Sequence, residues 1–456
     1  MSNLVLIKNG TVVTSEGVSK SDVLIEDSKI LEVGPSIERE DAQNIDATGM
    51  YVFPGFIDAH THYHLVSRGT VTADSFPQGS RLATFGGVTT VVDFADHQKG
   101  MNLTDSLNIR LDEMKDGMNI DYTLHQGVYG HGFTADIEKQ LEELKKQGVK
   151  TLKIFTTYRE TGYLLEEREK IKSLFRYAKK LGMLVTAHCE YNPDIEKISK
   201  NWKGDFLPHA HADLRPAEAE GKAIEFYGTC ALEEDCPFYV VHCSSEAGLN
   251  AIRDLRRKGA TVYAETTPTY LFLDRRLLEG KDGPLYVMTP PLRTEKDCSA
   301  LRQAVLNGEI QVVATDHCSF TREQKLSSSD VRSIYPGIPG TEELFHLLFT
   351  MWSQNPVVGL EKIVSVVTEN PAKLFGIYPQ KGSLKEGSDA DVVIYDPTEK
   401  WTLTDECVHT AALYTPYRGF EVQGHVKMTF LRGRLMMEDG KYYGEGNKGL
   451  FLKQHD

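Results

Sequence analysis

The sequence predicts an α/β protein in which eight strand and helix pairs close into a parallel barrel, with a small β domain beside it built from both ends of the chain. Strand-like runs recur with charged, amphipathic stretches between them, which is the pattern of parallel strands joined by helices. Short strand-like runs set off by glycine and proline also stand at both ends of the chain. At 456 residues the chain is longer than one hydrophobic core accommodates, so two domains are expected.

Eight strand-like runs lie in the central part of the chain. They occupy residues 53–60, 88–94, 121–127, 150–156, 183–188, 237–242, 260–266 and 310–316. Between them, the stretch 136–146 is typical of a surface helix, since Ile137, Leu141 and Leu144 share one face. Eight such pairs favour a (β/α)8 barrel, which keeps its chemistry at the carboxyl ends of the strands. A doubly wound open sheet stays the alternative, because strand counting does not exclude it.

Both termini are predicted to form one small β-sandwich. The strand-like runs there are residues 3–7, 22–26, 391–395 and 428–431. We therefore expect residues 1–50 and 385–456 to be the two parts of the small domain and residues 51–384 to be the barrel.

Composition and charge restrict the possible functions. A formal charge of -14 and a pI near 5.6 argue against a nucleic-acid or anionic-membrane partner. The start of the chain lacks a secretory signal, and no segment approaches the ~20 apolar residues of a membrane span, so a cytoplasmic protein is expected. The seven cysteines form no Cys-x-x-Cys pair and are expected to be reduced structural thiols.

An apolar run leads into His60-Thr61-His62. Because side chains alternate along an extended segment, His60 and His62 point to the same side, and two neutral imidazoles form half of a divalent metal site. A His-x-His pair alone is more often a chance pair of surface histidines. The remaining candidates are His188, His242 and Asp316, which end the fifth, sixth and eighth predicted strands. Each alone is commonly structural, but together they predict a metal centre on one face of the barrel.

Lys153 stands in an apolar strand, opposite in alternation to Leu152 and Ile154. Alone, it would be a lysine that extends its amine to the barrel rim. Among four imidazoles and two dications the neutral amine is favoured instead. A neutral amine captures carbon dioxide as a carbamate, which is an anionic bridge for two metals.

Several motifs together resemble the cyclic amidohydrolases. They are Gly-x-x-Asp-x-His-x-His at 55–62, Lys153, His188, His242, Thr-Asp-His at 315–317 and Asn-Pro-Ala-Lys-Leu-Phe-Gly at 370–376. Further motifs narrow the resemblance to the hydantoinase and dihydropyrimidinase branch, and it covers essentially the whole chain. These are Gly69-Thr-Val-Thr-Ala-Asp-x-Phe76, Gly86-Gly-Val-Thr-Thr90, His211-Ala-x-x-Arg-Pro216, Thr289-Pro-Pro-Leu-Arg293 and Gly382-x-Leu-x-x-Gly-Ser-Asp-Ala-Asp391.

The resemblance implies a TIM-like barrel of the amidohydrolase type with a β-sandwich, and two divalent metal ions, usually zinc. His60, His62 and Asp316 would hold the first metal, His188 and His242 the second, and carbamylated Lys153 would bridge them. A hydroxide whose pKa the metals lower would attack the ring carbonyl, with Asp316 passing its proton to the leaving nitrogen. Tyr158 would donate to the oxyanion, although an aromatic at a loop edge usually serves packing. The family also implies a homotetramer in which the tail, residues 444–451, contacts neighbouring subunits.

Two positions depart from the branch. Thr289 replaces a serine, which is a mild change if the contact to the substrate runs through backbone atoms. Pro336 replaces an asparagine, which keeps a carbonyl but loses a side-chain amide and an N–H, so a contact made by the carbonyl survives and one made by the asparagine side chain is lost. Both are expected to bind substrate.

Other positions indicate the kind of ring. Tyr63-His64 follows His-x-His, where dihydroorotases carry a carboxylate-binding arginine, so a neutral ring is favoured. Tyr63, Leu65 and Phe155 are expected to line the pocket and to suit an aryl or alkyl substituent, although such residues also serve as core filler.

The predicted function is therefore hydrolysis of a small cyclic imide, a 5-substituted hydantoin or dihydropyrimidine, to an N-carbamoyl amino acid. Allantoinase is the nearest alternative. A non-catalytic scaffolding relative is another, but the complete ligand set argues against it.

Overall fold

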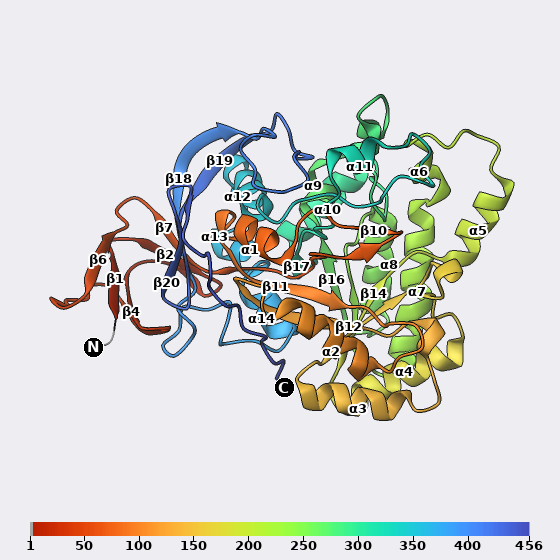
Figure 1. Cartoon of the computed structure of the whole chain (residues 1–456), viewed down its shortest axis with the longest axis horizontal. Helices are drawn as coiled ribbons and strands as arrows, with labels where there is room; N and C mark the ends of the chain where they lie inside the picture. Colours follow the sequence, from red (N-terminus) through yellow and green to blue (C-terminus); the bar gives the residue numbers. More distant parts are fainter. Residues whose placement is uncertain (1–2, 456) are drawn as a thin grey trace.

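The computed structural model describes residues 3–455 and shows a parallel barrel beside two sheets built from the chain termini (Figure 1). The barrel strands are β8 Phe56–Asp58, β11 Val88–Ala95, β12 Asp121–Gly127, β13 Thr151–Phe155, β14 Leu184–His188, β15 Phe238–Val240, β16 Val262–Thr266 and β17 Val312–Val313. They pair in sequence order, each parallel to the next.

The backbone of Val366 and Val367 lies at the seam between β17 and β8. Val313 N–H donates to the Val366 carbonyl at 3.1 Å, and Ile57 N–H donates to the Val367 carbonyl at 2.8 Å. A parallel bridge between Thr61 and His317 joins the segments that follow β8 and β17. The predicted barrel is confirmed over the open sheet.

Helices cover the outside of the barrel. The main helices are α1 Phe76–Phe85, α2 Leu103–Met114, α3 Ile137–Gln147, α4 Arg168–Leu181, α7 Ala217–Glu233, α8 Glu246–Arg257, α10 Glu295–Leu306 and α12 Leu344–Gln354. Shorter ones are α5 Asn192–Asn201, α6 Ala210–Leu214, α9 Pro268–Phe272, α11 Arg322–Leu326, α13 Leu360–Ser365 and α14 Glu369–Leu374, with 3-10 turns η1 Gly130–Gly132, η2 Arg159–Thr161, η3 Arg275–Leu278 and η4 Gly283–Tyr286. Helix α3 buries Ile137, Leu141 and Leu144, as its pattern predicts.

Strands from both termini lie side by side in the small domain (Figure 1). One sheet has the order β5 Lys29–Gly34, β4 Asp22–Glu26, β1 Leu4–Lys8 and β6 Gln43–Asp46. The other has the order β21 Lys441–Tyr442, β20 Arg434–Glu438, β19 Glu421–Leu431, β18 Val392–Thr402, β7 Tyr51–Pro54, β2 Thr11–Thr14 and β3 Gly17–Lys20. Buried Ile7, Val23, Val52 and Val392 belong to one apolar cluster that joins these strands, so both ends of the chain share a core. The exact boundaries at 50 and 384 stay predictions, and residues 1, 2 and 456 lie outside the described residues.

The predicted strand 53–60 is wrong as a single element. It is two strands in different sheets, since β7 pairs with β18 and β8 pairs with β11. The chain crosses between them at Gly55, where a Cβ would lie 2.2 Å from Thr89 Oγ1 and 2.8 Å from the Asp391 Cβ. Only glycine fits this close approach, and it lets one apolar run serve both domains.

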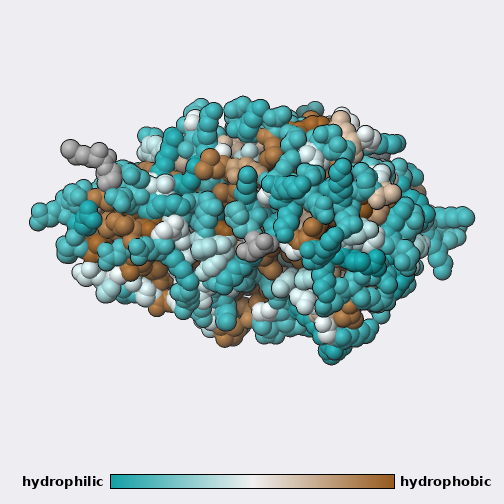
Figure 2. Space-filling view, turned by 90° about the horizontal axis from the view of Figure 1, so that it is seen from below, coloured by the Kyte–Doolittle hydropathy of each residue, from teal (hydrophilic) through white to brown (hydrophobic). Residues whose placement is uncertain are grey.

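The tail packs against its own barrel. Gly449 N–H donates to Met118 O at 2.8 Å, Leu452 N–H to Tyr122 O at 2.7 Å, and His455 N–H to Gly376 O at 2.7 Å. Figure 2 shows a largely hydrophilic face on which hydrophobic side chains form scattered groups. Within residues 3–455, none of the helices has the length and apolar character needed to cross a bilayer.

Candidate active site

A cavity of about 620 Å³ opens at the carboxyl ends of the barrel strands. It brings together eleven of the twelve residues predicted for the site. They are His60, His62, Leu65, Lys153, Phe155, Tyr158, His188, His242, Thr289, Asp316 and Pro336. The remaining residue, Tyr63, does not line the cavity.

The first group of possible metal ligands joins the end of β8 to the end of β17. His60 Nε2 and His62 Nε2 each lie 3.2 Å from Asp316 Oδ1, and the three donor atoms lie within 4.8 Å of one another. His60 Nδ1 lies 2.8 Å from the buried carboxylate of Glu265, which holds the ring proton on that nitrogen. The His60 Nε2 lone pair therefore faces Asp316 and is available to a metal.

The second group comes from β14 and β15. His188 Nδ1 lies 3.0 Å from His242 Nε2, and His188 Nε2 lies 2.7 Å from Glu190 Oε2. Because Glu190 holds the Nε2 proton, His188 Nδ1 is left with its lone pair. Burial lowers the pKa of both rings and favours their neutral forms. His242 Nδ1 has no hydrogen-bond partner among residues 3–455.

Lys153 projects from β13 into the same cavity and is 2% exposed. Its Nζ lies 5.0 Å from the ring centre of Phe94 and 5.3 Å from that of Phe155. Within the described residues it forms no ion pair, and burial lowers its pKa to about 8, although Asp316 and Glu265 oppose the shift. Burial therefore brings the amine closer to the predicted neutral form, and burial rather than the neighbouring imidazoles is the main cause.

These donor atoms fit divalent transition-metal ions. Imidazole nitrogens with one carboxylate are the ligands that zinc and its neighbours prefer. His188 Nδ1 and His242 Nε2 lie 3.0 Å apart, close enough to share a proton or to bind one cation together. Glu265 and Glu190 accept from His60 Nδ1 and His188 Nε2, so the other ring nitrogen of each histidine is free to face the cavity.

Tyr158 stands beside the second histidine group, at the turn after β13. Its backbone is left-handed, with φ at 66°, and its ring centre lies 5.6 Å from that of His188. The guanidinium of Arg215 lies 5.1 Å from the Tyr158 ring centre and donates to Glu190 Oε2 at 2.6 Å. Arg215 therefore supports both the tyrosine and the carboxylate that orients His188.

A buried lysine fixes the two segments that carry Thr289 and Pro336. Lys325 Nζ donates to the carbonyls of Tyr335 at 2.8 Å and Gly337 at 2.9 Å, and also to that of Val287. Sequence reasoning missed Lys325, Glu190, Glu265 and Arg215 as supporting residues. Of these four residues, only Arg215 could have been found from the sequence, because it belongs to the motif His211-Ala-x-x-Arg-Pro216.

The expectation that Tyr63 lines the pocket is wrong. Its side chain is 0% exposed, and its hydroxyl donates to Thr341 Oγ1 at 3.2 Å. The alternation that directs His60 and His62 into the cavity turns Tyr63 away from it. The character of the pocket therefore rests on Leu65 and Phe155. The preference for a neutral ring stays a prediction, because it rests on the lack of an arginine at position 63 and not on Tyr63 lining the pocket.

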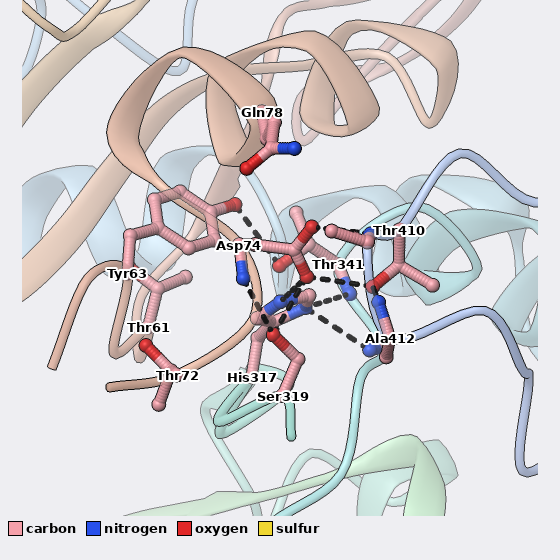
Figure 3. A network of polar contacts seen from close by, with 12 residues as sticks. Thr61, Tyr63, Thr72, Asp74, Gln78, His317, Ser319, Thr341, Thr410 and Ala412 are labelled. Atoms are coloured by element: carbon pink, nitrogen blue, oxygen red, sulfur yellow. Dashed lines mark hydrogen bonds and ion pairs between the residues drawn. The ribbon is translucent and has the colours of Figure 1, made fainter. Parts of the chain in front are cut away.

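Tyr63 instead lies next to a buried polar network around Asp74 and His317 (Figure 3). The Asp74 carboxylate accepts from His317 Nε2 at 3.0 Å, Ser319 Oγ at 2.6 Å and Thr410 Oγ1 at 2.6 Å. His317 Nδ1 accepts from Gly340 N–H at 3.1 Å. This network holds the backbone directly after Asp316, whose own φ is 54°.

Together, the barrel and its donor atoms define an enzyme of the amidohydrolase class. Residues 51–436 match the Amidohydrolase family, and the chain belongs to that family. It is 35% identical to a D-hydantoinase of Ralstonia pickettii over 99% of this chain and 98% of that protein.

Two solved structures extend the comparison. A dihydropyrimidinase from Brevibacillus agri superposes with a TM-score of 0.95 at 35% identity, covering 99% of this chain and 98% of the other. An L-hydantoinase from Arthrobacter aurescens gives 0.89 at 26% identity and covers 100% of both chains. The chain is thus a cyclic amidohydrolase of the hydantoinase and dihydropyrimidinase type.

Proposed function

We propose that the protein uses two divalent metal ions, most often zinc in this family, to open the cyclic amide bond of a neutral imide ring. The substrate is a 5-substituted hydantoin or a dihydropyrimidine, and the product is an N-carbamoyl amino acid. The observation that carries the proposal is that two groups of imidazole nitrogens converge on one cavity with an amine that has no ion-pair partner among residues 3–455.

Each ligand has a distinct task in this proposal. His60, His62 and Asp316 would hold one metal, His188 and His242 would hold the other, and Lys153, once carbamylated by carbon dioxide, would be a ligand of both. When bound, the two cations would lower the pKa of a water molecule and polarise the ring carbonyl.

Three groups of this chain would handle protons and bind the ring. Asp316 accepts a proton from the attacking water and gives it to the leaving ring nitrogen; imidazoles around it keep its pKa low despite burial. Tyr158 donates to the developing oxyanion, and burial raises its pKa, so its proton is retained near neutral pH. The backbones of Thr289 and Pro336 would hold the polar edge of the ring.

Leu65 and Phe155 favour this reaction over allantoin hydrolysis, because they offer the substituent apolar contact rather than partners for a ureide. The complete set of donor atoms argues against a non-catalytic scaffold. Relatives named hydantoinase and dihydropyrimidinase agree with the proposed ring chemistry.

A substrate panel with metal analysis tests the proposal. Dihydrouracil, hydantoin, 5-phenylhydantoin and allantoin are compared by kcat/KM on protein whose metal content has been measured. We expect about two metal ions per chain and the highest kcat/KM on a hydantoin or dihydrouracil. Preference for allantoin would select the alternative, and an intact metal-free protein without activity would exclude the enzyme.

Replacing Tyr158 tests the oxyanion donor. Tyr158→Phe keeps the ring beside Arg215 and removes only the hydroxyl, so kcat should fall roughly 10²–10³-fold, as for loss of one oxyanion-hole donor. Metal content should not change. A kcat equal to that of the unmodified enzyme would leave Tyr158 a packing residue.

A further inference from the structure

An arginine stands at the rim of the substrate cavity, on a hairpin that closes one side of it. Strands β9 Val66–Ser67 and β10 Thr70–Val71 pair in antiparallel register, and the two residues between them are Arg68 and Gly69. Both have positive φ, 50° and 79°. Such two-residue turns usually carry asparagine, aspartate or glycine at the first position, so an arginine there is at a conformational disadvantage.

The guanidinium of Arg68 is directed across the cavity rim and has weak partners. Its Nη1 lies 3.4 Å from the carbonyls of Arg332 and Ile334. Within residues 3–455, no carboxylate forms an ion pair with it. Its charge reaches into the site: burial raises the pKa of Tyr158, Arg215 opposes that shift, and Arg68 also opposes it.

Other charges at the rim are already engaged or do not reach Arg68. Arg332 pairs with Asp330 and lies 3.7 Å from the ring centre of Phe206. Asp96 accepts a hydrogen bond from the hydroxyl of Tyr129. Glu160 lines the same cavity but forms no ion pair with Arg68.

The position of Arg68 suits contact with the exocyclic substituent rather than the ring. The metal-binding side chains are buried or half-buried at the inner end of the cavity, whereas Arg68 is exposed at the rim. A ring held at the inner end leaves its substituent facing the rim. Arginine binds carboxylates through two parallel N–H donors, and Nε and Nη2 of Arg68 have no protein partner among the described residues.

We infer that this enzyme accepts rings whose exocyclic substituent carries a carboxylate, and that Arg68 selects them. The inference rests on the proposed function and defines its substrate class more closely. Leu65 and Phe155 contact the methylene part of such a substituent, and Arg68 pairs with its acidic end.

The test compares 5-(2-carboxyethyl)hydantoin with its amide, 5-(2-carbamoylethyl)hydantoin, which has nearly the same shape and no charge. We expect kcat/KM to be roughly tenfold higher for the acid than for the amide at low salt. This ratio lies between the effect of a fully exposed ion pair and that of a desolvated one. The preference should shrink at high salt because the pair is at a solvent-exposed rim. Arg68→Gln should abolish it by lowering kcat/KM for the acid more than for the amide.

Arg332→Gln is the matched control, since it removes a cation of the same rim that Asp330 already neutralises, and it should keep the preference. If Arg68→Gln lost activity on acid and amide alike, Arg68 would serve only to hold the hairpin against residues 332–334. That result would overturn the inference. Equal kcat/KM for acid and amide in the unmodified enzyme would overturn it too.

Calorimetric binding of both compounds separates this result from the proposed function. If neither ring is hydrolysed, the proposed reaction fails. Tighter binding of the acid that Arg68→Gln removes would still support the carboxylate site, and equal binding would overturn it.

Discussion

Two buried lysines at different places in the molecule have opposite electrostatic surroundings. Lys381, 1% exposed on its side chain, lies 2.6 Å from Asp121, 2.8 Å from Asp391 and 3.1 Å from Asp389. Lys153 is almost as deeply buried but has no carboxylate partner within the described chain. The three aspartates raise the pKa of Lys381, whereas burial lowers that of Lys153 to about 8.

The difference follows from what each lysine contacts. Asp121 begins a barrel strand and Asp391 directly precedes a strand of the terminal sheet, so Lys381 ties the two domains together as a permanent cation. Lys153 stands at the other, carboxyl end of the barrel strands, where loss of its proton is easy. Of these two lysines, the one without an anion lies in the candidate active site, and the one among anions holds the fold together.

Removing Lys153 should have the largest effect on activity. Lys153→Ala deletes the proposed bridge between the metals, so activity should fall by about 10⁴-fold or more, given the several kcal/mol that metal ions supply. Metal content should drop below two ions per chain, while the denaturation midpoint of the metal-free protein should not fall. A variant that keeps both ions and full turnover would remove the bridge from the mechanism.

Removing Lys381 should damage stability instead. Lys381→Met removes the cation that three buried aspartates share and leaves Asp391 without a cationic partner among the described residues, which should cost about 3–5 kcal/mol of unfolding free energy. Urea unfolding measures this cost, and kcat per folded, metal-loaded molecule should stay as it is. A large drop in that kcat would show that Lys381 also affects catalysis. The contrast between a structural Lys381 and a catalytic Lys153 would then be wrong.

Sequence reasoning found the residues at strand ends and missed those that act through distant contacts. His188 and His242 were predictable because apolar runs end at them. Glu265 was not, since its contact with His60 joins positions 205 residues apart. The pairing of Lys381 with Asp121 spans 260 residues and was equally invisible.

Two errors came from local patterns. The run 53–60 reads as one strand because apolar residues stand on both sides of Pro54 and Gly55, but the strand pairing and the close approach of Thr89 show that the chain changes sheets there. Tyr63 was placed in the pocket for its chemistry, although alternation from His62 already turns it away.

Glu343 is a buried acid without an ion-pair partner among the described residues, and it tests what such a charge costs in stability. The expected effect is the smallest of the three. Glu343 is 3% exposed and accepts a hydrogen bond from Thr415 Oγ1 at 2.7 Å. Burial and the neighbouring Glu342 raise its pKa to about 7. Because the folded state holds this proton more tightly than the unfolded state does, the contribution of Glu343 to stability is complete below about pH 4.3 and is lost as the pH rises to about 7.

Glu343→Gln imitates the protonated acid and can still accept from Thr415. The variant should be more stable than the unmodified protein by about 1–3 kcal/mol at pH 8, and equally stable near pH 4.3. Urea unfolding at both pH values, at matched metal loading, measures the difference. An equal gain at both would mean that ionisation of Glu343 is not its cause. A gain confined to high pH would show that a buried charge without a partner costs stability at a position that does not line the cavity.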